Sequence, residues 1–158
     1  IYDVSHNIAK MEEHVVSGSK CKCCVHRKGA TRSLGGDHPE LAPRFSGVGQ
    51  PVLVPGDMGT ASWVLAGNEK GGNDAFSSSC HGAGRRLSRT AARKIVNPQE
   101  LSSRLESEGV FVRAKTPRML SEEAPEAYKD VDEVIRLTHE AGLARPVARL
   151  KPFAVIKG

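Results

Sequence analysis

The spacing of hydrophobic and polar residues changes partway along the chain. In the first part, short runs alternate between apolar and polar positions, as in residues 13–16 and 20–26, which flank a small polar turn at residues 17–19. A period of two is typical of strands, and a short turn between two such runs predicts a β-hairpin. The opening residues 1–4 predict a further strand.

Glycine-rich loops separate these strands from two later ones. Prolines close the apolar run at residues 51–55, and another strand is expected at residues 61–66. Residues 27–50 and 67–79 are expected to be loops. Loops of this length are uncommon in compact domains unless they bind something, so functional residues are expected in them.

Helical spacing and capping signals begin after residue 87. Residues 88–94 predict a short helix, and Asn97 followed by Pro98 begins a second helix that Gly109 ends. The clearest helix is expected at residues 130–141, with Gly142 after it. Its apolar face carries Val131, Val134, Ile135 and Thr138. Further strands are expected at residues 110–112 and within residues 147–156.

The order of these elements indicates the fold class. Strands and loops come first, and helices interleaved with strands follow, which favours α+β over a regular βαβ array. We therefore expect an α+β fold with mixed or antiparallel sheets, flanking helices and long glycine-rich loops. A chain of 158 residues is long enough for one domain of ordinary size.

Composition adds the class of partner and compartment. Hydrophobic residues make up 39% of the chain but aromatic residues only 4%, so the core is expected to consist mainly of Val, Leu, Ile and Ala. The net charge of +5 favours a polyanionic partner without requiring one. The sequence has neither a signal-peptide pattern nor an apolar run long enough to span a bilayer, so we expect a cytoplasmic protein without a membrane partner. The chain begins with Ile1 and not with Met, and Ile1 lies in an expected strand. We therefore interpret the chain as the C-terminal part of a larger protein.

Three of the four cysteines lie close together, at Cys21, Cys23 and Cys24. Their spacing differs from the Cys-x-x-Cys pattern of zinc sites, and no second pair follows. Alternation along a strand places Cys21 and Cys23 on one face and Cys24 on the other. Strand packing is therefore favoured over a soft-metal site, which is the alternative, and disulfides are not expected in a cytosolic chain.

The sequence at residues 79–86, Ser-Cys-His-Gly-Ala-Gly-Arg-Arg, is the most informative run. Small residues around His81 allow an anionic group to approach the imidazole closely. The N–H groups of a glycine turn and the two guanidinium groups match phosphate oxygens. A neutral imidazole is also a nucleophile toward phosphorus. The run predicts a histidine placed against phosphate, with a tight turn that has no chemistry as the alternative.

Three other segments could contribute to such a site. His6 is a candidate metal ligand, but one imidazole cannot hold a metal, so a structural histidine is the alternative. The cations in residues 26–32 suit a phosphate or an RNA backbone, with an exposed basic loop as the alternative. The glycine loop at residues 55–62 lacks the Gly-Lys-Ser/Thr ending of a Walker loop.

Seven short words are spread over essentially the whole chain. They are Tyr-Asp-Val-Ser-His-Asn at 2–7, Val-His-Arg-Lys-Gly-Ala-Thr-Arg at 25–32, Gly-Gln-Pro-Val-Leu at 49–53, Met-Gly-Thr at 58–60, Ser-Cys-His-Gly-Ala-Gly-Arg at 79–85, Glu-Glu-Ala-Pro-Glu-Ala-Tyr at 122–128 and Lys-Gly at 157–158. Together they resemble the RtcB-type RNA ligases, which join RNA 3′-phosphate or 2′,3′-cyclic phosphate ends to 5′-hydroxyl ends.

The resemblance implies a mechanism for these residues. In that family a histidine attacks the α-phosphate of GTP and carries GMP as a phosphoramidate, and His81 matches this residue. GMP then passes to the RNA 3′-phosphate, and the 5′-hydroxyl displaces it. The family's metal is manganese, and His6 matches one of its ligands. GTP, Mn²⁺ and RNA with these two kinds of end, in tRNA splicing or RNA repair, are therefore the expected partners.

The resemblance also implies a set of nucleotide contacts. Arg85 matches a position suited to an RNA phosphate or to the released pyrophosphate. Lys157 is expected to donate to a guanine acceptor, and Tyr128 is expected to pack on or bond to the nucleotide. Archaeal members have Ser where this chain has Asp57, whose carboxylate could accept from guanine N1–H and its amine. The expected nucleotide-binding residues are Asn7, Lys28, Asp57, Ser62, Ala83, Tyr128 and Lys157.

The family's metal site is incomplete in this sequence. Its other manganese ligands, an aspartate, a cysteine and two histidines, belong to the N-terminal part of the family, and no residues here match them. We therefore expect residues 1–158 to be the C-terminal part of one catalytic domain, to need the N-terminal part as a partner, and to be inactive alone. The alternative function is a non-catalytic nucleotide- or RNA-binding remnant of the family.

Overall fold

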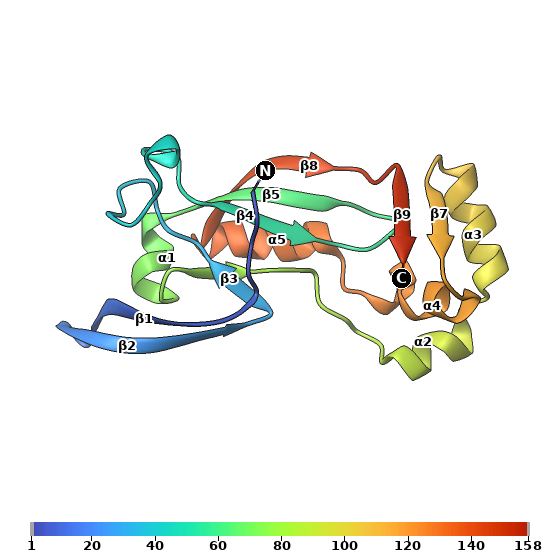
Figure 1. The fold of residues 1–158 in the computed structure, drawn as a ribbon, viewed down its shortest axis with the longest axis horizontal. Helices are drawn as coiled ribbons and strands as arrows, with labels where there is room; N and C mark the ends of the chain where they lie inside the picture. The colour runs from blue at the N-terminus through green and yellow to red at the C-terminus, as the bar shows by residue number, and fades with distance from the viewer. Residues whose placement is uncertain (1, 158) are drawn as a thin grey trace.

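A computed structural model describes residues 2–157, apart from the side chains of residues 72 and 73. The molecule is elongated, with a β-hairpin at one end, a small antiparallel sheet in the middle and short helices at the other end (Figure 1). The strands are β1 (Asn7–Val16), β2 (Ser19–Lys28), β3 (Ala30–Arg32), β4 (Pro51–Pro55), β5 (Ser62–Gly67), β6 (Ser78–Cys80), β7 (Phe111–Ala114), β8 (Ala144–Leu150) and β9 (Ala154–Lys157). The helices are α1 (Glu69–Asp74), α2 (Arg89–Ile95), α3 (Pro98–Ser107), α4 (Pro117–Glu122) and α5 (Val131–Glu140), with 3₁₀ turns η1 (Pro43–Phe45) and η2 (Pro125–Ala127).

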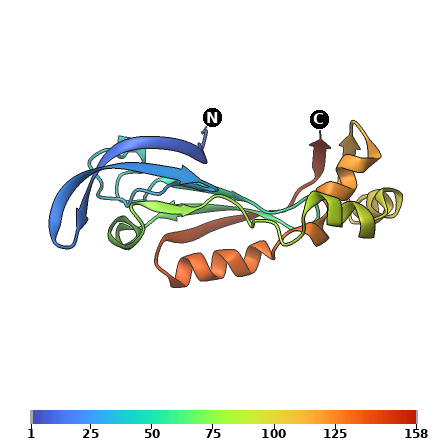
Figure 2. The ribbon, with the colours of Figure 1, turned by 90° about the horizontal axis from the view of Figure 1, so that it is seen from below.

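The central sheet has the strand order β4-β5-β8 and is antiparallel throughout. Helix α5 packs against one of its faces, below the sheet in Figure 2. Burial of the apolar stripe of α5 against this sheet is the main driving force for its formation, because a helix of this length is marginal alone. The core between them contains Val52, Val54, Ala61, Leu65, Ala83, Val131, Ile135 and Ala144.

A second core lies at the helical end. There β7 and β9 pair in parallel, and α3 and α4 contact β7. Met58, from the loop after β4, is buried in this core, so the loop is held between the two cores. The other buried members are Leu101, Leu105, Val110, Val112 and Ala124.

A buried side chain, that of Arg27, attaches the β1–β2 hairpin to the rest of the molecule. The Arg27 guanidinium is 2% exposed and donates two hydrogen bonds of 2.8 Å to the Glu12 carboxylate across the hairpin. It also donates to the Phe76 carbonyl at 2.7 Å and to Ser78 Oγ at 2.9 Å. One side chain therefore connects the hairpin to the segment that leads into His81.

Strands β3 and β6 form the closest link between the hairpin and His81. Ala30 pairs with Cys80 and Arg32 with Ser78, although some 50 positions separate the partners. Because β3 directly follows the hairpin and β6 directly precedes His81, this ladder brings the base of the hairpin beside that residue.

The fold confirms the expected α+β class and most of the expected elements. The hairpin, β4, β5, α2, α3, α5 and β7 all form at or near their predicted positions. The strand expected at residues 1–4 is wrong for residues 2–4, where the Tyr2 hydroxyl bonds to the Pro51 carbonyl at 2.9 Å but no ladder forms. Ile1 and Gly158 lie outside the described residues.

Two short helices were not expected. Helix α1 interrupts the predicted loop at residues 67–79 because the Asn68 side chain accepts a hydrogen bond from Lys70 N and so caps its first turn. Helix α4 begins at Pro117, a favourable first helical residue. None of the helices within residues 2–157 has the length and apolar character needed to cross a bilayer.

Candidate functional site

Backbone hydrogen bonds hold three distant segments together at His81. The N–H of Gly29 donates to the carbonyl of His6 at 3.0 Å, and the carbonyl of Gly29 accepts from the N–H of His81 at 3.3 Å. A single residue between β2 and β3 therefore fixes the position of both histidines. This contact confirms that His6 and His81, 75 positions apart in the sequence, lie at one place.

The two imidazole rings are stacked. Their centroids are 4.1 Å apart and their planes differ by 4°. The Nδ1 atom of His81 is buried and has no hydrogen-bond partner among the described residues. Burial lowers the pKa of His81 and the neighbouring His6 lowers it further, whereas the Leu53 backbone opposes the shift weakly. The His81 ring is therefore neutral at pH 7 and keeps a nitrogen lone pair.

The turn after His81 is fixed against the end of β4. The N–H of Ala83 donates to the carbonyl of Pro55 at 3.1 Å, and the Ala83 side chain is buried in the central core. Gly84 has φ +77°, a conformation that favours glycine. Its carbonyl accepts from the N–H of Lys129 at 2.9 Å. The predicted Gly-x-Gly turn thus exists and joins His81 to the loop that begins at Pro55.

A cavity of about 340 Å³ opens on the other side of this loop. Four of the expected nucleotide-binding residues, Asp57, Ser62, Tyr128 and Lys157, line it. They come from four segments: the loop after β4, the start of β5, the residue after η2 and the end of β9. The fold therefore gathers at one cavity residues that the sequence separates by up to 100 positions.

An ionic network forms one wall of the cavity. Arg85 donates from Nη1 to the Tyr128 hydroxyl at 3.0 Å and to Glu123 Oε1 at 3.2 Å, and its guanidinium lies 4.9 Å from the centre of the Tyr128 ring. The Tyr128 hydroxyl donates to Glu123 Oε2, and Lys157 Nζ lies 3.8 Å from the same oxygen. Burial raises the pKa of Tyr128, and Glu123 raises it further against the opposing effect of Arg85.

Arg85 has all its nitrogens engaged within the chain. Besides these contacts, Nε donates to the Leu87 carbonyl at 3.1 Å and Nη2 donates to the Glu122 carbonyl. These bonds use four of its five N–H groups, and the second N–H of Nη2 is the one that an RNA phosphate or pyrophosphate could accept without replacing any of them. That role of Arg85 stays a prediction.

Asp57 uses its carboxylate to shape its own loop. Oδ1 accepts from the N–H groups of Gly59 at 2.8 Å and Thr60 at 3.0 Å, and Oδ2 accepts from the Thr60 hydroxyl at 2.8 Å. This is the side-chain-to-backbone bonding that favours Asp in turns. Oδ2 accepts one of these three bonds and keeps a second lone pair, so a contact between Oδ2 and a base remains possible.

Asn7 and Lys28 lie opposite each other at the open end of the hairpin, next to His6 and Gly29. Both side chains are exposed. The expected site residues thus fall into two groups. The hairpin side contains His6, Asn7, Lys28 and His81, and the cavity side contains Asp57, Ser62, Tyr128 and Lys157. Ala83, bonded to Pro55, connects the two.

The sequence analysis did not identify Glu123 as a functional residue. Its only signal was its place in the word Glu-Glu-Ala-Pro-Glu-Ala-Tyr, in which two adjacent acidic residues precede the predicted nucleotide contact Tyr128. Which of the two carboxylates faces the cavity depends on the direction in which α4 ends, and the sequence does not specify this.

The donor set for a metal is incomplete in this chain. No group of three or more His, Cys, Asp or Glu side chains suited to a metal occurs among the described residues. His6 offers one imidazole, which is too few ligands for a manganese site. The described residues alone therefore do not fit a complete metal centre.

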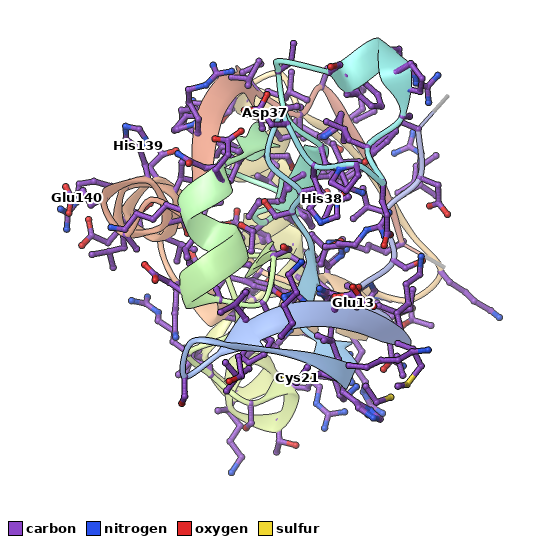
Figure 3. The ribbon with its side chains drawn as sticks, turned by 90° about the vertical axis from the view of Figure 1, so that its left-hand side faces the viewer. Glu13, Cys21, Asp37, His38, His139 and Glu140 are labelled. Carbon is purple, nitrogen blue, oxygen red and sulfur yellow. The ribbon has the colours of Figure 1, made fainter. Side chains whose placement is uncertain are left out.

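The cysteines behave as strand residues. Cys21 and Cys23 are half-buried on one face of β2, with their Sγ atoms 3.3 Å apart, and Cys24 is exposed on the other face. Figure 3 looks at this end of the molecule and shows Cys21 on the hairpin, below Asp37 and His38. The predicted alternation is confirmed.

Comparison with known proteins identifies the family. The family model for the tRNA-splicing ligase RtcB matches residues 1–158. Over the whole chain, 54% of positions are identical to the tRNA-splicing ligase RtcB of Thermococcus kodakarensis and 51% to that of Archaeoglobus fulgidus. The RNA-splicing ligase RtcB of Mycobacterium tuberculosis is also 54% identical. The chain spans 33% of the two archaeal relatives and 36% of the mycobacterial one. Because the family model matches the whole chain, the chain belongs to the RtcB family of tRNA-splicing ligases.

Proposed function

We propose that this chain supplies the guanylylated histidine and much of the GTP pocket of a manganese-dependent RNA ligase. The enzyme would join 3′-phosphate or 2′,3′-cyclic phosphate ends of RNA to 5′-hydroxyl ends. The observation that supports this most is the position of His81. Its neutral ring stacks on His6, and its following turn is bonded to Pro55 at the edge of the cavity.

The chemistry requires an activated 3′ end. A nitrogen lone pair of His81 attacks the α-phosphorus of GTP, forming a P–N bond and releasing pyrophosphate. The terminal phosphate of the RNA then attacks this phosphorus, the P–N bond breaks, and GMP becomes attached to the RNA. Finally the 5′-hydroxyl attacks the RNA phosphate, forms the new phosphodiester and expels GMP, while its proton passes to a base. Without GMP, the phosphate monoester would have no good leaving group.

The other residues would bind and orient the nucleotide. Ser62, Tyr128 and Lys157 offer hydroxyl and ammonium groups inside a cavity large enough for a base. Lys28 and Asn7, at the exposed end of the hairpin, would contact phosphate oxygens near His81. Manganese would neutralise charge on the transferring phosphoryl group, and His6 would be one of its ligands.

Covalent labelling tests the proposal. We would join this chain to the remaining two-thirds of the Thermococcus kodakarensis relative, giving a completed ligase, and incubate it with α-labelled GTP and Mn²⁺. Label should remain on the protein, labile to acid and stable to alkali as phosphoramidates are. His81→Ala should remove it, whereas His139→Ala, at an exposed residue of α5 (Figure 3), should not. Label retained by His81→Ala would refute the proposal.

A second test follows from the incomplete set of metal ligands among the described residues. Because the described residues form no metal centre, this chain alone should not join RNA ends. If the completed ligase binds GTP but never retains label, the alternative of a non-catalytic nucleotide- or RNA-binding remnant replaces the proposal.

A further inference from the structure

We propose that Glu123 is a positioning residue that holds Tyr128 and Lys157 in the wall of the cavity and thereby sets its selectivity for guanine. The inference rests on the proposed function, because it assumes that the cavity binds a guanine nucleotide. Glu123 is not itself a catalytic residue, since its contacts are with other side chains of the protein.

The contacts of Glu123 join three segments that are distant in the sequence. Its Oε2 accepts from the Tyr128 hydroxyl and lies 3.8 Å from Lys157 Nζ, at the end of β9. Its Oε1 accepts from Arg85 Nη1 at 3.2 Å, in the turn that follows His81. One carboxylate directly after α4 therefore connects the nucleophile's turn to both expected base contacts.

Burial makes these contacts stronger than those of an ordinary surface carboxylate. The Glu123 side chain is 21% exposed and lines the cavity. Lys157 is more exposed, at 36%, and a lysine side chain has many rotamers. Holding its ammonium beside a fixed carboxylate reduces the entropy that nucleotide binding must remove. The side-chain entropy of the base contacts is then lost during folding and not during nucleotide binding.

The negative charge of Glu123 also affects nucleotide affinity, in the opposite direction to positioning. The test must separate these two effects. Glu123 is the carboxylate nearest to Arg85 and Lys157 in this network, and Arg89 lies 3.8 Å away. Its neutralisation leaves an excess of positive charge, which attracts any triphosphate regardless of the base. Loss of positioning instead weakens the contacts with the base. The ratio of GTP to ATP affinity distinguishes the two effects.

Glu122 provides a matched control. Its carboxylate belongs to the last residue of α4, is 19% exposed, and lies 3.3 Å from Arg93 and 3.9 Å from Arg89. It does not line the cavity. Glu122→Gln removes the same charge one residue away and leaves both base contacts in place.

The binding experiment measures GTP and ATP affinities of the completed ligase by calorimetry. In Glu123→Gln one carboxylate oxygen becomes an NH2 donor, so either Arg85 or the Tyr128–Lys157 pair loses its acceptor and the negative charge is removed from both; the preference for GTP over ATP should therefore fall about 10-fold. In Glu122→Gln the preference should not change. Equal preferences in the wild type and Glu123→Gln would overturn the inference alone. Absence of GTP binding by the wild type would refute the proposed function, and the inference with it.

A second readout needs no nucleotide. With ¹³Cζ-labelled tyrosine, NMR follows the ionisation of Tyr128, whose signal is assigned by its absence in Tyr128→Phe. Burial keeps the pKa of this phenol high, and Glu123 adds to the effect through its hydrogen bond and charge. Glu123→Gln should therefore lower the pKa of Tyr128, and Glu122→Gln should leave it unchanged. An unchanged Tyr128 titration in Glu123→Gln would show that the contact does not hold the phenol and would overturn the inference.

Discussion

The two sides of the candidate site differ in how their polar groups are bonded. On the cavity side, Asp57, Glu123 and Tyr128 each bond to other groups of the chain. On the hairpin side, His6, Asn7 and Lys28 are exposed, and a buried nitrogen of His81 has no partner within the described residues. The polar groups of the cavity side form an internal network, whereas those of the hairpin side have no side-chain hydrogen bond with the described residues.

This difference indicates which part of the site the chain builds alone. Bonded polar groups in a half-buried network are already oriented, so the cavity side is organised before any ligand arrives. Exposed cations and amides at the end of a hairpin acquire a fixed geometry only when they bind something. In the proposed function, that something is phosphate together with the other two-thirds of the ligase. The geometry of the hairpin side should therefore depend more strongly on Arg27, which bonds the hairpin to residues 76–78.

The largest effect on stability is expected from replacing Arg27, which bonds the hairpin to residues 76–78. Arg27→Leu leaves the buried Glu12 carboxylate with only His14, 3.0 Å away, as a partner among the described residues, and it removes the bonds to residues 76–78. Breaking such a buried pair costs about 3–5 kcal/mol. We expect the free energy of unfolding, measured with urea, to fall by this amount.

Arg136→Leu is the matched control for this change. Arg136 also bonds two carboxylates, those of Glu133 and Glu140, but on the exposed surface of α5. Surface ion pairs contribute little, so its loss should leave the urea midpoint essentially unchanged. If Arg27→Leu behaves like Arg136→Leu, the ion pair does not hold the hairpin.

A smaller effect is expected on the cavity side, at Asp57. Asp57→Ala removes three hydrogen bonds of the loop and should reduce stability by about 1–2 kcal/mol. Asp57→Asn keeps an oxygen for the backbone N–H groups and should retain most of that stability. If the carboxylate also accepts from guanine, Asp57→Asn should still weaken GTP binding by about 10-fold. Unchanged GTP binding by this variant would show that Asp57 shapes the loop only.

The smallest effect is expected on β2 away from the site. Replacing Cys21, Cys23 and Cys24 together by Ser should leave GTP affinity unchanged, because these side chains alternate across a strand and form no metal cluster with the other described residues. Calorimetry on the completed ligase checks this. A large loss of affinity would revive the soft-metal interpretation of these cysteines.

Local patterns were enough to predict most elements of the fold. Asn97 caps α3 by accepting from Gln99 N and Glu100 N, and Val131, Ile135 and Thr138 are buried on one face of α5, as their spacing predicted. The cue for α1 was weaker, because a short helix with two consecutive glycines has low intrinsic propensity and depends on its cap at Asn68.

Long-range contacts could not be predicted in the same way. The pairing of Ala30 with Cys80 leaves no periodic signal, yet it places the hairpin beside His81. Resemblance predicted Tyr128 and Lys157 as nucleotide contacts, but their common attachment to Glu123 depends on how α4 and β9 come together in space. The sequence could thus suggest candidate residues but not the contacts that hold them.

The backbone of Gly29 has a consequence for how the site tolerates change. Both of its hydrogen bonds, to His6 on one side and to His81 on the other, use main-chain atoms. Side chains of the surrounding residues can therefore vary during evolution without breaking either bond. A tilt of the hairpin, in contrast, is transmitted to the backbone of His81 through a single residue.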